Sequence, residues 1–255
     1  HVSVLDFGFI HSHATYDVFR IKDTKPRFMD LHVERFNQSC RYFGFSPIQN
    51  IPQRAEELLH INKLSDAFVW LCAWSGTPHS GSPRDINCPQ HSLIYVKPYY
   101  GLVKTNNFTL CINRRYRRVP DLCYEQKYKN FGWIEFNLAQ KEAVSAGYDS
   151  ALLLDPSGGV TEGPGFGICF VDNGKVVTPK DNCLRSVTIS VVERICNTNG
   201  IPFERRFIAE KEVPLFDEVF ACSTSGGITP VSHIDSTVYT DIITRKIMTL
   251  FDQEC

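Results

Sequence analysis

Hydrophobic residues in the first half of the chain recur with two different spacings. Alternating or continuous apolar runs predict β-strands over Val2–Ile10, Tyr16–Ile21, Phe68–Trp74 and Ser92–Tyr99. Apolar residues three and four positions apart predict a helix over Met29–Phe43, and a second helix runs over Pro52–Leu64, where proline suits the first turn. The order is β, β, α, α, β, β, with a long loop of small and polar residues from Ser75 to Gln90 that is suited to covering a site.

In the second half, strands and helices alternate. The pattern predicts strands over Phe108–Arg115, Ala151–Asp155 and Glu218–Cys222, helices over Trp133–Ala146 and Leu184–Asn199, and a hairpin of Gly167–Val171 with Lys175–Thr178 around Asp172-Asn173-Gly174. Ser236–Glu254 is predicted to contain a short strand pair and a C-terminal helix. We therefore expect an α/β (α+β) protein of two domains, residues 1–99 and 107–255, joined by a linker at 100–106.

Composition and charge exclude several classes of function. The chain is 43% hydrophobic and 22% charged, which is ordinary for a soluble protein, and its net charge is −1. No apolar run approaches the roughly 18–20 residues of a membrane span. The short basic run of Arg114, Arg115, Arg117 and Arg118 is a weak nucleic-acid signal in a nearly neutral chain, so we interpret it as solvated or site-lining. We expect no membrane and no nucleic-acid partner.

The ten cysteines show no Cys-x-x-Cys spacing, and several lie in apolar runs. They are typical of reduced, buried thiols, which fits a cytoplasmic location. His11 and His13 have no cysteine or carboxylate at ligand spacing, so we expect no metal site.

Two polar residues indicate chemistry. Lys129 lies in the stretch Lys127-Tyr128-Lys129-Asn130-Phe131-Gly132-Trp133, shortly before a predicted helix, and Glu162 lies in a Thr-Glu-Gly turn. A lone lysine is usually a solvated surface cation. An amine and a carboxylate in these settings together suggest a site for pyridoxal phosphate. There the lysine forms a Schiff base with the aldehyde, and the carboxylate keeps the pyridine nitrogen protonated.

A phosphate group requires backbone N–H donors, hydroxyls and preferably an arginine. Leu184–Thr188 opens a predicted helix with serine and threonine, and Cys222–Gly227 follows an apolar strand with three hydroxyls and two glycines. Each segment has an alternative interpretation as an N-cap or a plain turn. Arg35, on the first long helix, would alone be interpreted as a solvated cation. Together with Lys129 and Glu162, these segments form an ordered set.

That set resembles the class IV pyridoxal-phosphate aminotransferases, the fold type IV group that includes branched-chain and D-amino acid aminotransferases. It is most similar to the (R)-selective amine transaminases, and the resemblance covers nearly the whole chain. The matching segments are Leu5–Ser12 with Thr15–Val18, His32–Arg35, Arg117–Pro120, Lys129-Asn130, Thr161–Gly163, Thr178-Pro179 and Ser223–Ile228. The resemblance implies a small α/β domain, a large cofactor-binding domain and a homodimer with sites near the subunit interface.

The resemblance also implies a role for each matching position. Lys129 would form the internal aldimine and then carry a proton between the substrate Cα and the cofactor C4′, while Glu162 would pair with the pyridinium nitrogen. The phosphate would be held by Arg35, Val187, Thr188, Ser223 and Thr224. The substrate pocket would be lined by His11, Tyr16, Val18 and Trp133, with loop residues Ser75–Arg84 closing it and Arg84 binding a substrate carboxylate.

Three positions depart from the family pattern and bear on the phosphate site. Gly167 stands where asparagine is common, Ser186 where glycine is common, and Ile189 where arginine is common. The N-terminus also looks short, since relatives have more β structure before the segment that matches Val4-Leu5-Asp6. Lys129 and Glu162 are intact, so the predicted cofactor chemistry is unchanged.

The predicted activity is transfer of an amino group from an (R)-amine or D-amino acid to a keto acid such as pyruvate. The alternatives are a branched-chain L-amino acid aminotransferase and an aminodeoxychorismate lyase-like enzyme on the same fold. A catalytically silent cofactor-binding protein belongs to another class, and the intact pair of Lys129 and Glu162 argues against it. The sequence leaves the amino donor and acceptor open.

Overall fold

The computed structural model describes residues 2–100 and 107–254, which group into two compact units. Unit 1 contains the described residues up to Tyr100 together with Tyr128–Gly132, and unit 2 contains the remainder. Lys129 thus groups with unit 1, although the sequence prediction counted all residues from 107 onward as one domain. The predicted linker at 100–106 lies outside the described residues except for Tyr100.

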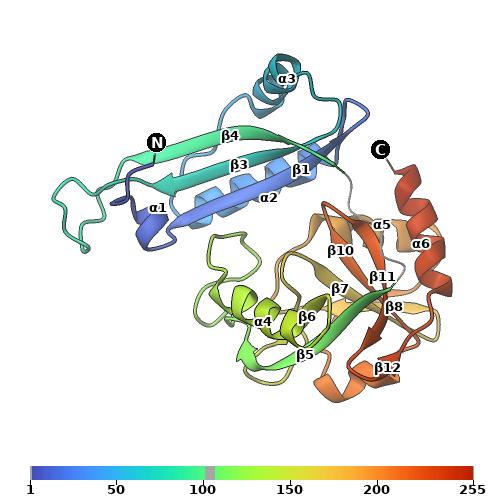
Figure 1. Ribbon diagram of the computed structural model, residues 1–255. Helices are drawn as coiled ribbons and strands as arrows, with labels where there is room; N and C mark the ends of the chain where they lie inside the picture. Colours follow the sequence, from blue (N-terminus) through green and yellow to red (C-terminus); the bar gives the residue numbers. More distant parts are fainter. Residues whose placement is uncertain (1, 101–106, 255) are drawn as a thin grey trace. The chain divides into compact units, whose positions relative to one another are not determined.

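Unit 1 is an antiparallel four-stranded sheet with the order β2-β1-β3-β4, accompanied by helices (Figure 1). Its strands are β1 (Ala14–Lys22), β2 (Lys25–Arg27), β3 (Ala67–Ser75) and β4 (Gln90–Pro98), and its helices are α1 (Phe7–Ile10), α2 (Met29–Tyr42) and α3 (Ile51–Asn62). The predicted strands at β1, β3 and β4 and both predicted helices are confirmed to within two or three residues at their ends. The three-residue β2 was missed.

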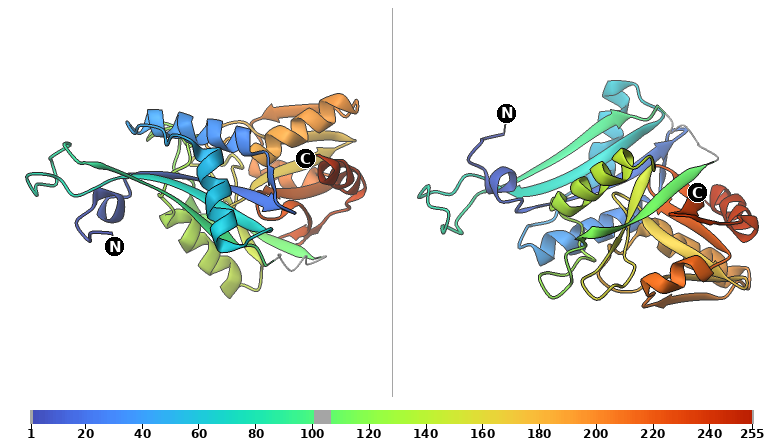
Figure 2. Two further views of the ribbon diagram at one scale, coloured as in Figure 1. Left: turned by 90° about the horizontal axis from the view of Figure 1, so that it is seen from above. Right: turned by 60° about the horizontal axis from the view of Figure 1, so that its bottom comes forward.

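Alternation along β1 and β3 gives this sheet two different faces. On one face Phe19, Val69 and Leu71 form a core with side chains of α2 and α3, including Phe36 and Ile51, and α2 runs along the sheet in Figure 2. Full burial of such a side chain contributes about 1.5–3 kcal/mol. The intervening residues of the two strands point to the opposite face.

The strand predicted over Val2–Ile10 is wrong, because Phe7–Ile10 is the short helix α1. Asp6 is buried and accepts hydrogen bonds from Trp74 Nε1 and Thr77 Oγ1, at 3.2 and 2.8 Å. A Cβ on Gly8 would come within 2.5 Å of the Trp74 side chain, so the backbone itself packs on the indole. The apolar spacing resembled a strand, but none of the described strands pairs with this segment.

Unit 2 is built on a mixed eight-stranded sheet with the order β6-β5-β11-β10-β7-β8-β9, and β12 pairs with β11. Its strands are β5 (Phe108–Arg117), β6 (Ser150–Leu154), β7 (Gly167–Asp172), β8 (Lys175–Pro179), β9 (Phe203–Arg206), β10 (Glu218–Ser223), β11 (Gly227–Ile234) and β12 (Thr237–Val238). Its helices are α4 (Ile134–Ser145), α5 (Val187–Thr198), the 3-10 helix η1 (Glu210–Leu215) and α6 (Ile242–Gln253). The predicted β7–β8 hairpin and the helices at α4, α5 and α6 are confirmed, whereas β9 and β11 were missed.

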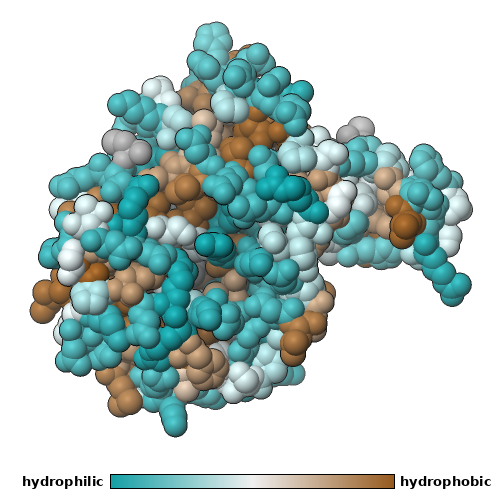
Figure 3. Space-filling view, turned by 180° about the vertical axis from the view of Figure 1, so that it is seen from behind, coloured by the Kyte–Doolittle hydropathy of each residue, from teal (hydrophilic) through white to brown (hydrophobic). Residues whose placement is uncertain are grey.

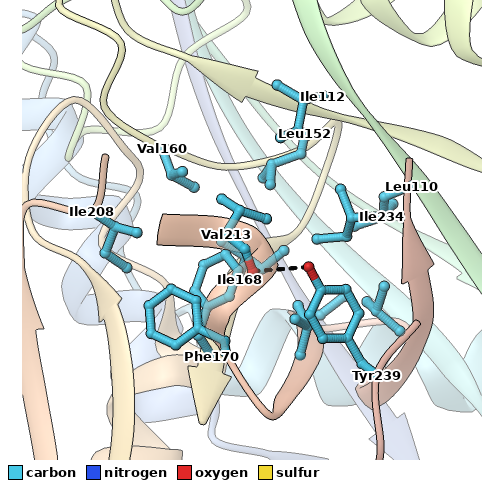
Figure 4. Close-up of a cluster of buried hydrophobic side chains, with 14 of the residues drawn as sticks. Leu110, Ile112, Leu152, Val160, Ile168, Phe170, Ile208, Val213, Ile234 and Tyr239 are labelled. Atoms are coloured by element: carbon cyan, nitrogen blue, oxygen red, sulfur yellow. Dashed lines mark hydrogen bonds between the residues drawn. The ribbon is translucent and has the colours of Figure 1, made fainter. Parts of the chain in front are cut away.

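The core of unit 2 lies where the sheet, the 3-10 helix and the turn before β7 meet. Figure 4 shows aliphatic and aromatic side chains from β5, β6, β7 and β11 gathered in one cluster. Its one polar group, the Tyr239 hydroxyl, donates a 2.9 Å hydrogen bond to the carbonyl oxygen of Val213. A second, smaller cluster beneath α4 contains Phe136 and fixes this helix on β5 and β6.

The surface is predominantly polar on the face drawn in Figure 3, where hydrophobic side chains form small separate groups. Among the helices that the structure describes, none combines the length and apolar character that a membrane span needs.

Candidate active site

The backbone of Lys129 is hydrogen-bonded to a strand and a helix of unit 1. Thr15 Oγ1, on β1, donates a 2.6 Å hydrogen bond to the Lys129 carbonyl oxygen, and the Lys129 N–H donates to Ser39 Oγ at 3.2 Å. Ser39 lies on α2 and in turn donates to the carbonyl oxygen of Arg35 at 3.0 Å. β2 pairs only with Arg20–Lys22 of β1, so Lys129 lies beside the part of β1 that β2 does not cover. A strand and a helix therefore fix the position of the lysine.

The Lys129 side chain lies against an aromatic surface. Its Nζ is 4.5 Å from the centre of the Tyr16 ring. Tyr16 stacks on Trp70 at 5.5 Å, and Trp70 stacks on Tyr95 at 5.6 Å, so three neighbouring strands contribute one ring each. Val18 faces Trp70 across the β1–β3 pair and belongs to the same face. The amine thus lies beside a row of aromatic rings, a surface on which apolar groups pack favourably.

Arg35 takes part in a buried charged cluster on the other face of the sheet. Its Nε and one Nη donate to the two oxygens of Asp17 at 2.7 and 2.8 Å, and His32 Nδ1 donates to Asp17 at 2.8 Å. Burial would raise the pKa of Asp17, but the charges of Arg35 and His32 hold it well below its usual range. Burial lowers the pKa of His32, and the attraction of Asp17 only partly opposes this effect. The cluster fixes the predicted phosphate ligand in place on α2.

Glu162 lies in unit 2, where a second buried arginine holds it. Its Oε1 accepts hydrogen bonds from Arg118 Nε at 2.9 Å and from the Leu184 N–H at 3.0 Å. Arg118 Nη1 also donates to Glu135 Oε1 at 2.5 Å. Burial would lower the pKa of Arg118, but the carboxylates of Glu162 and Glu135 outweigh it and raise that pKa. Glu162 is 5% exposed, and no described residue donates to its Oε2.

The start of α5 corrects one prediction and explains that contact. The helix was predicted from Leu184, but it begins at Val187, with Ser186 as the N-cap accepting a 3.3 Å hydrogen bond from the Ile189 N–H. Because Leu184 precedes the helix, its N–H is available to Glu162. Thr188 is buried in the first turn, so the first N–H groups and a hydroxyl lie where an anion would bind.

The second predicted phosphate segment lies beside the start of α5. Ser223 ends β10, next to Cys222, which pairs with Gly167. Ser223 Oγ accepts a 2.9 Å hydrogen bond from the Gly226 N–H, so this hydroxyl stabilises the turn that contains Thr224. A Cβ on Gly167 would lie 3.6 Å from Ser186 Cβ, which places the strand end and the helix N-cap close together.

Gly167 and Ile189, two departures from the family pattern, contact each other. A Cβ on Gly167 would lie 2.6 Å from Ile189 Cδ1, which is closer than two carbon atoms can approach. The isoleucine therefore occupies the space that a side chain at 167 would need. Residues 167 and 189 therefore have to be considered together when either is changed.

The remaining predicted pocket residues have less defined settings. His11 is exposed at the end of α1, where its ring lies 4.4 Å from Phe7. Arg84 is exposed on the loop between β3 and β4. Trp133 precedes α4 in unit 2 and contacts Phe136 at 5.3 Å between ring centres. In unit 1 the Lys129 amine lies beside Tyr16, and the Lys129 backbone is connected to Arg35 through Ser39. In unit 2 Glu162 accepts a hydrogen bond from Leu184, shortly before α5.

Four participating residues were not assigned to the site from the sequence: Asp17, His32, Arg118 and Glu135. His32 and Arg118 lay in matching segments, but nothing in their spacing revealed which carboxylate each would meet. Arg114 and Arg115 are more than half exposed, whereas the Arg118 side chain is 4% exposed. The register shift of β5 between Asn113 and Arg117 separates these arginines, and an irregularity of this kind leaves no sequence signal.

Comparison with known proteins defines the class. The model of the family described as Amino-transferase class IV matches residues 14–234. The match spans most of the chain, which therefore belongs to the class IV aminotransferases and is a pyridoxal-phosphate-dependent aminotransferase.

Individual relatives are similar over nearly their whole lengths. A protein of Methanocaldococcus jannaschii named "Putative branched-chain-amino-acid aminotransferase" is 28% identical over 98% of this chain and 90% of its own. D-alanine aminotransferase of Staphylococcus epidermidis is 25% identical over 99% of this chain and 92% of its own. The crystal structure of the Thermoproteus uzoniensis branched-chain aminotransferase with norvaline superposes with a TM-score of 0.92 at 25% identity, covering 99% of this chain and 89% of that one. These similarities confirm the predicted fold type IV architecture.

The chain's own residues fit the cofactor. A carboxylate in a mostly buried position is stabilised when both of its oxygens accept hydrogen bonds. Both donors that the described residues give Glu162 go to Oε1, so Oε2 can still accept a hydrogen bond, and a protonated pyridine nitrogen would supply that donor. The hydroxyls and N–H groups at the start of α5 suit a phosphate in the same unit.

Proposed function

We propose that this enzyme transfers the amino group of a hydrophobic amino donor to a keto acid, with Lys129 as its catalytic residue. The observation that supports a hydrophobic donor is the stack of Tyr16, Trp70 and Tyr95 next to Lys129 Nζ. A surface of this kind stabilises an aliphatic or aromatic side chain by burying apolar area, and it favours a charged one less.

Pyridoxal phosphate, when bound, supplies an electron sink for the charge that develops when a bond to the donor Cα breaks. Lys129 Nζ would hold the cofactor covalently and accept the proton that leaves Cα. Thr15 and Ser39 fix the lysine backbone, so the amine returns to the same place in each cycle. Glu162 would keep the ring nitrogen protonated through Oε2.

The predicted ligand set remains our proposal for the other groups. Arg35, Val187, Thr188, Ser223 and Thr224 would bind the phosphate, and Tyr16, Val18 and Trp133 would line the substrate pocket. His11 and Arg84 would approach it from exposed positions, with Arg84 pairing with a substrate carboxylate.

Two classes of amino donor fit the proposal. A branched-chain L-amino acid is favoured by relatives such as the Methanocaldococcus protein. An (R)-amine or a D-amino acid is favoured by the resemblance to (R)-amine transaminases and by the D-alanine aminotransferase relative. Both are compatible with the aromatic surface.

A donor panel tests the proposal. We expect L-leucine, D-alanine or (R)-1-phenylethylamine to be turned over with pyruvate or 2-oxoglutarate, and the preferred donor decides between the two forms. Lys129→Ala should abolish turnover and the absorbance of the covalently held cofactor. If no donor reacts and pyruvate is instead released from aminodeoxychorismate, the enzyme is a lyase and the transamination proposal fails.

We further propose that the enzyme is a homodimer that acts in the cytoplasm, as the family resemblance implies. Light scattering of the purified protein should give twice the chain mass of 29.0 kDa. A monomeric mass in the active preparation would contradict the dimer.

A further inference from the structure

We propose that Glu135 is a positioning residue: through Arg118 it orients Glu162 and sets the charge that the cofactor ring nitrogen meets. This inference rests on the proposed pairing of Glu162 with that nitrogen. It concerns three side chains of unit 2 whose contacts are all within that unit.

The geometry makes Arg118 a bridge between two carboxylates. Its Nε donates to Glu162 and its Nη1 donates to Glu135, so two different nitrogens of one rigid guanidinium are engaged. Its backbone N–H is fixed on the carbonyl oxygen of Leu154 at 2.9 Å, and its guanidinium lies 4.5 Å from the Phe136 ring centre. With both ends and one face held, the guanidinium has little freedom to rotate.

Fixing Arg118 fixes Glu162. Two donors, Arg118 Nε and the Leu184 N–H, converge on the same oxygen, Oε1. A carboxylate is planar, so placing Oε1 determines where Oε2 lies. Without Glu135, the Arg118 guanidinium could turn to contact both oxygens of Glu162 in the bidentate manner that arginine prefers. Glu135 therefore keeps Oε2 available for a ligand.

Glu135 also sets the net charge of the cluster. One guanidinium and two carboxylates give the cluster a net charge of −1, and the side chains are only 4%, 12% and 7% exposed for Arg118, Glu135 and Glu162. If Glu135 were neutral, Arg118 and Glu162 would cancel and a protonated ring nitrogen would meet no net charge. In a poorly solvated site this difference is large enough to affect protonation of the ring nitrogen.

The test compares pyridoxal phosphate with a deaza analogue in which carbon replaces the ring nitrogen. Both are titrated into the full-length apoenzyme, and binding is followed by tryptophan fluorescence, so that no turnover is needed. We expect Glu135→Gln to weaken binding of pyridoxal phosphate about tenfold, the size of effect seen when residues that orient a ligand-binding group are changed. Binding of the analogue should change by less than about twofold.

Two controls define the interpretation. Glu142→Gln neutralises another glutamate of α4, one that pairs with the exposed Arg115 at 3.0 Å, and should leave both affinities unchanged. In a Glu162→Gln background, Glu135→Gln should add nothing, because its effect passes through Glu162. If Glu135→Gln does not fold, the same ratio of affinities measured for Glu135→Asp decides the question.

Equal weakening of cofactor and analogue by Glu135→Gln would show a purely structural role and overturn the inference, as would no change in either. If the unaltered enzyme itself binds both compounds equally, the pairing of Glu162 with the ring nitrogen fails as well. The failure of the inference and that of the proposed function are thus distinguishable.

Discussion

Arg35 in unit 1 and Arg118 in unit 2 are both buried, but they differ in how many carboxylates each one contacts. Arg35 meets one carboxylate, Asp17, and contacts both of its oxygens, while His32 adds another donor. Arg118 is divided between two carboxylates, and Glu162 receives donors at only one oxygen. In the first cluster both oxygens of the carboxylate accept hydrogen bonds, whereas in the second one oxygen of Glu162 has no donor among the described residues.

The difference shows that the same residue types can be arranged with or without an excess of negative charge. With neutral His32, the Asp17 cluster has no net charge, and removing one member leaves a buried charge unpaired. The Glu162 cluster has one carboxylate in excess, which a bound cation or protonated ring would balance. An excess of buried charge is therefore a better indicator of function than burial of charge alone.

Breaking the Asp17 cluster should have the largest effect on stability. Asp17→Asn removes the buried carboxylate that accepts hydrogen bonds from Arg35 and His32, and we expect a loss of about 3–5 kcal/mol in the free energy of unfolding. Urea denaturation monitored by circular dichroism measures it. A loss below about 1 kcal/mol, the value of an exposed ion pair, would show that this cluster is not structural.

Breaking the Glu162 cluster should cost less stability. Arg118→Met should lower the free energy of unfolding of the apoenzyme by about 2–3 kcal/mol at pH 7, because two carboxylates lose their cation. Urea denaturation of the two apoenzymes, monitored by circular dichroism, measures this loss. A loss below about 1 kcal/mol, the value of an exposed ion pair, would contradict this account.

Packing around Gly167 gives a third, intermediate effect. Gly167→Ala places a Cβ 2.6 Å from Ile189 Cδ1, and overpacking of this kind costs about 1–3 kcal/mol. The matched control is Gly167→Ala with Ile189→Val, which removes the Cδ1 atom and should recover most of the loss in melting temperature. If the double variant is no more stable than the single one, Ile189 is not the source of the strain.

Acidification should weaken unit 1 before unit 2. His32 has a lowered pKa in the folded protein, so below about 6.5 the unfolded chain binds a proton that the folded one does not. The stability that this difference provides is present above 6.5 and is lost as the pH falls, by at most about 1.4 kcal/mol per pH unit for one proton. The lowered pKa of Asp17 adds a second loss below its ordinary value of 3.8. His32→Gln should remove the slope just below pH 6.5, and an unchanged slope there would assign it to other groups.

The smallest expected effect concerns the lysine backbone. Thr15→Val keeps the shape of the side chain but removes the donor to the Lys129 carbonyl oxygen, at a cost of about 1 kcal/mol. Turnover should fall more than the affinity for cofactor, because the lysine is less well placed for proton transfer. Thr24→Val, which removes an exposed hydroxyl contact of the same unit, should change neither quantity.

Sequence patterns predicted the strands and the local motifs of this enzyme but not its long-range side-chain pairings. β1 and β3 alternate between a core face and an aromatic face, so periodicity located them. Local motifs led to the prediction of Lys129 and Glu162 as site residues. Arg118 was one of four arginines in a short run, and only the irregular register of β5 shows which of them is buried. Long-range pairings such as Arg118 with Glu135 depend on tertiary packing, which spacing along the chain does not encode.

The grouping of Tyr128–Gly132 with unit 1 has a consequence for how the chain can be divided. A cut after residue 101 would leave Lys129 on the C-terminal fragment, while its hydrogen-bonding partners Thr15 and Ser39 remain on the N-terminal one. If the two fragments were expressed as separate chains, residues 128–132 of the second would have to bind to the first before Lys129 gained these hydrogen bonds. Recovery of activity on mixing the two fragments would therefore report directly on the binding of this five-residue segment.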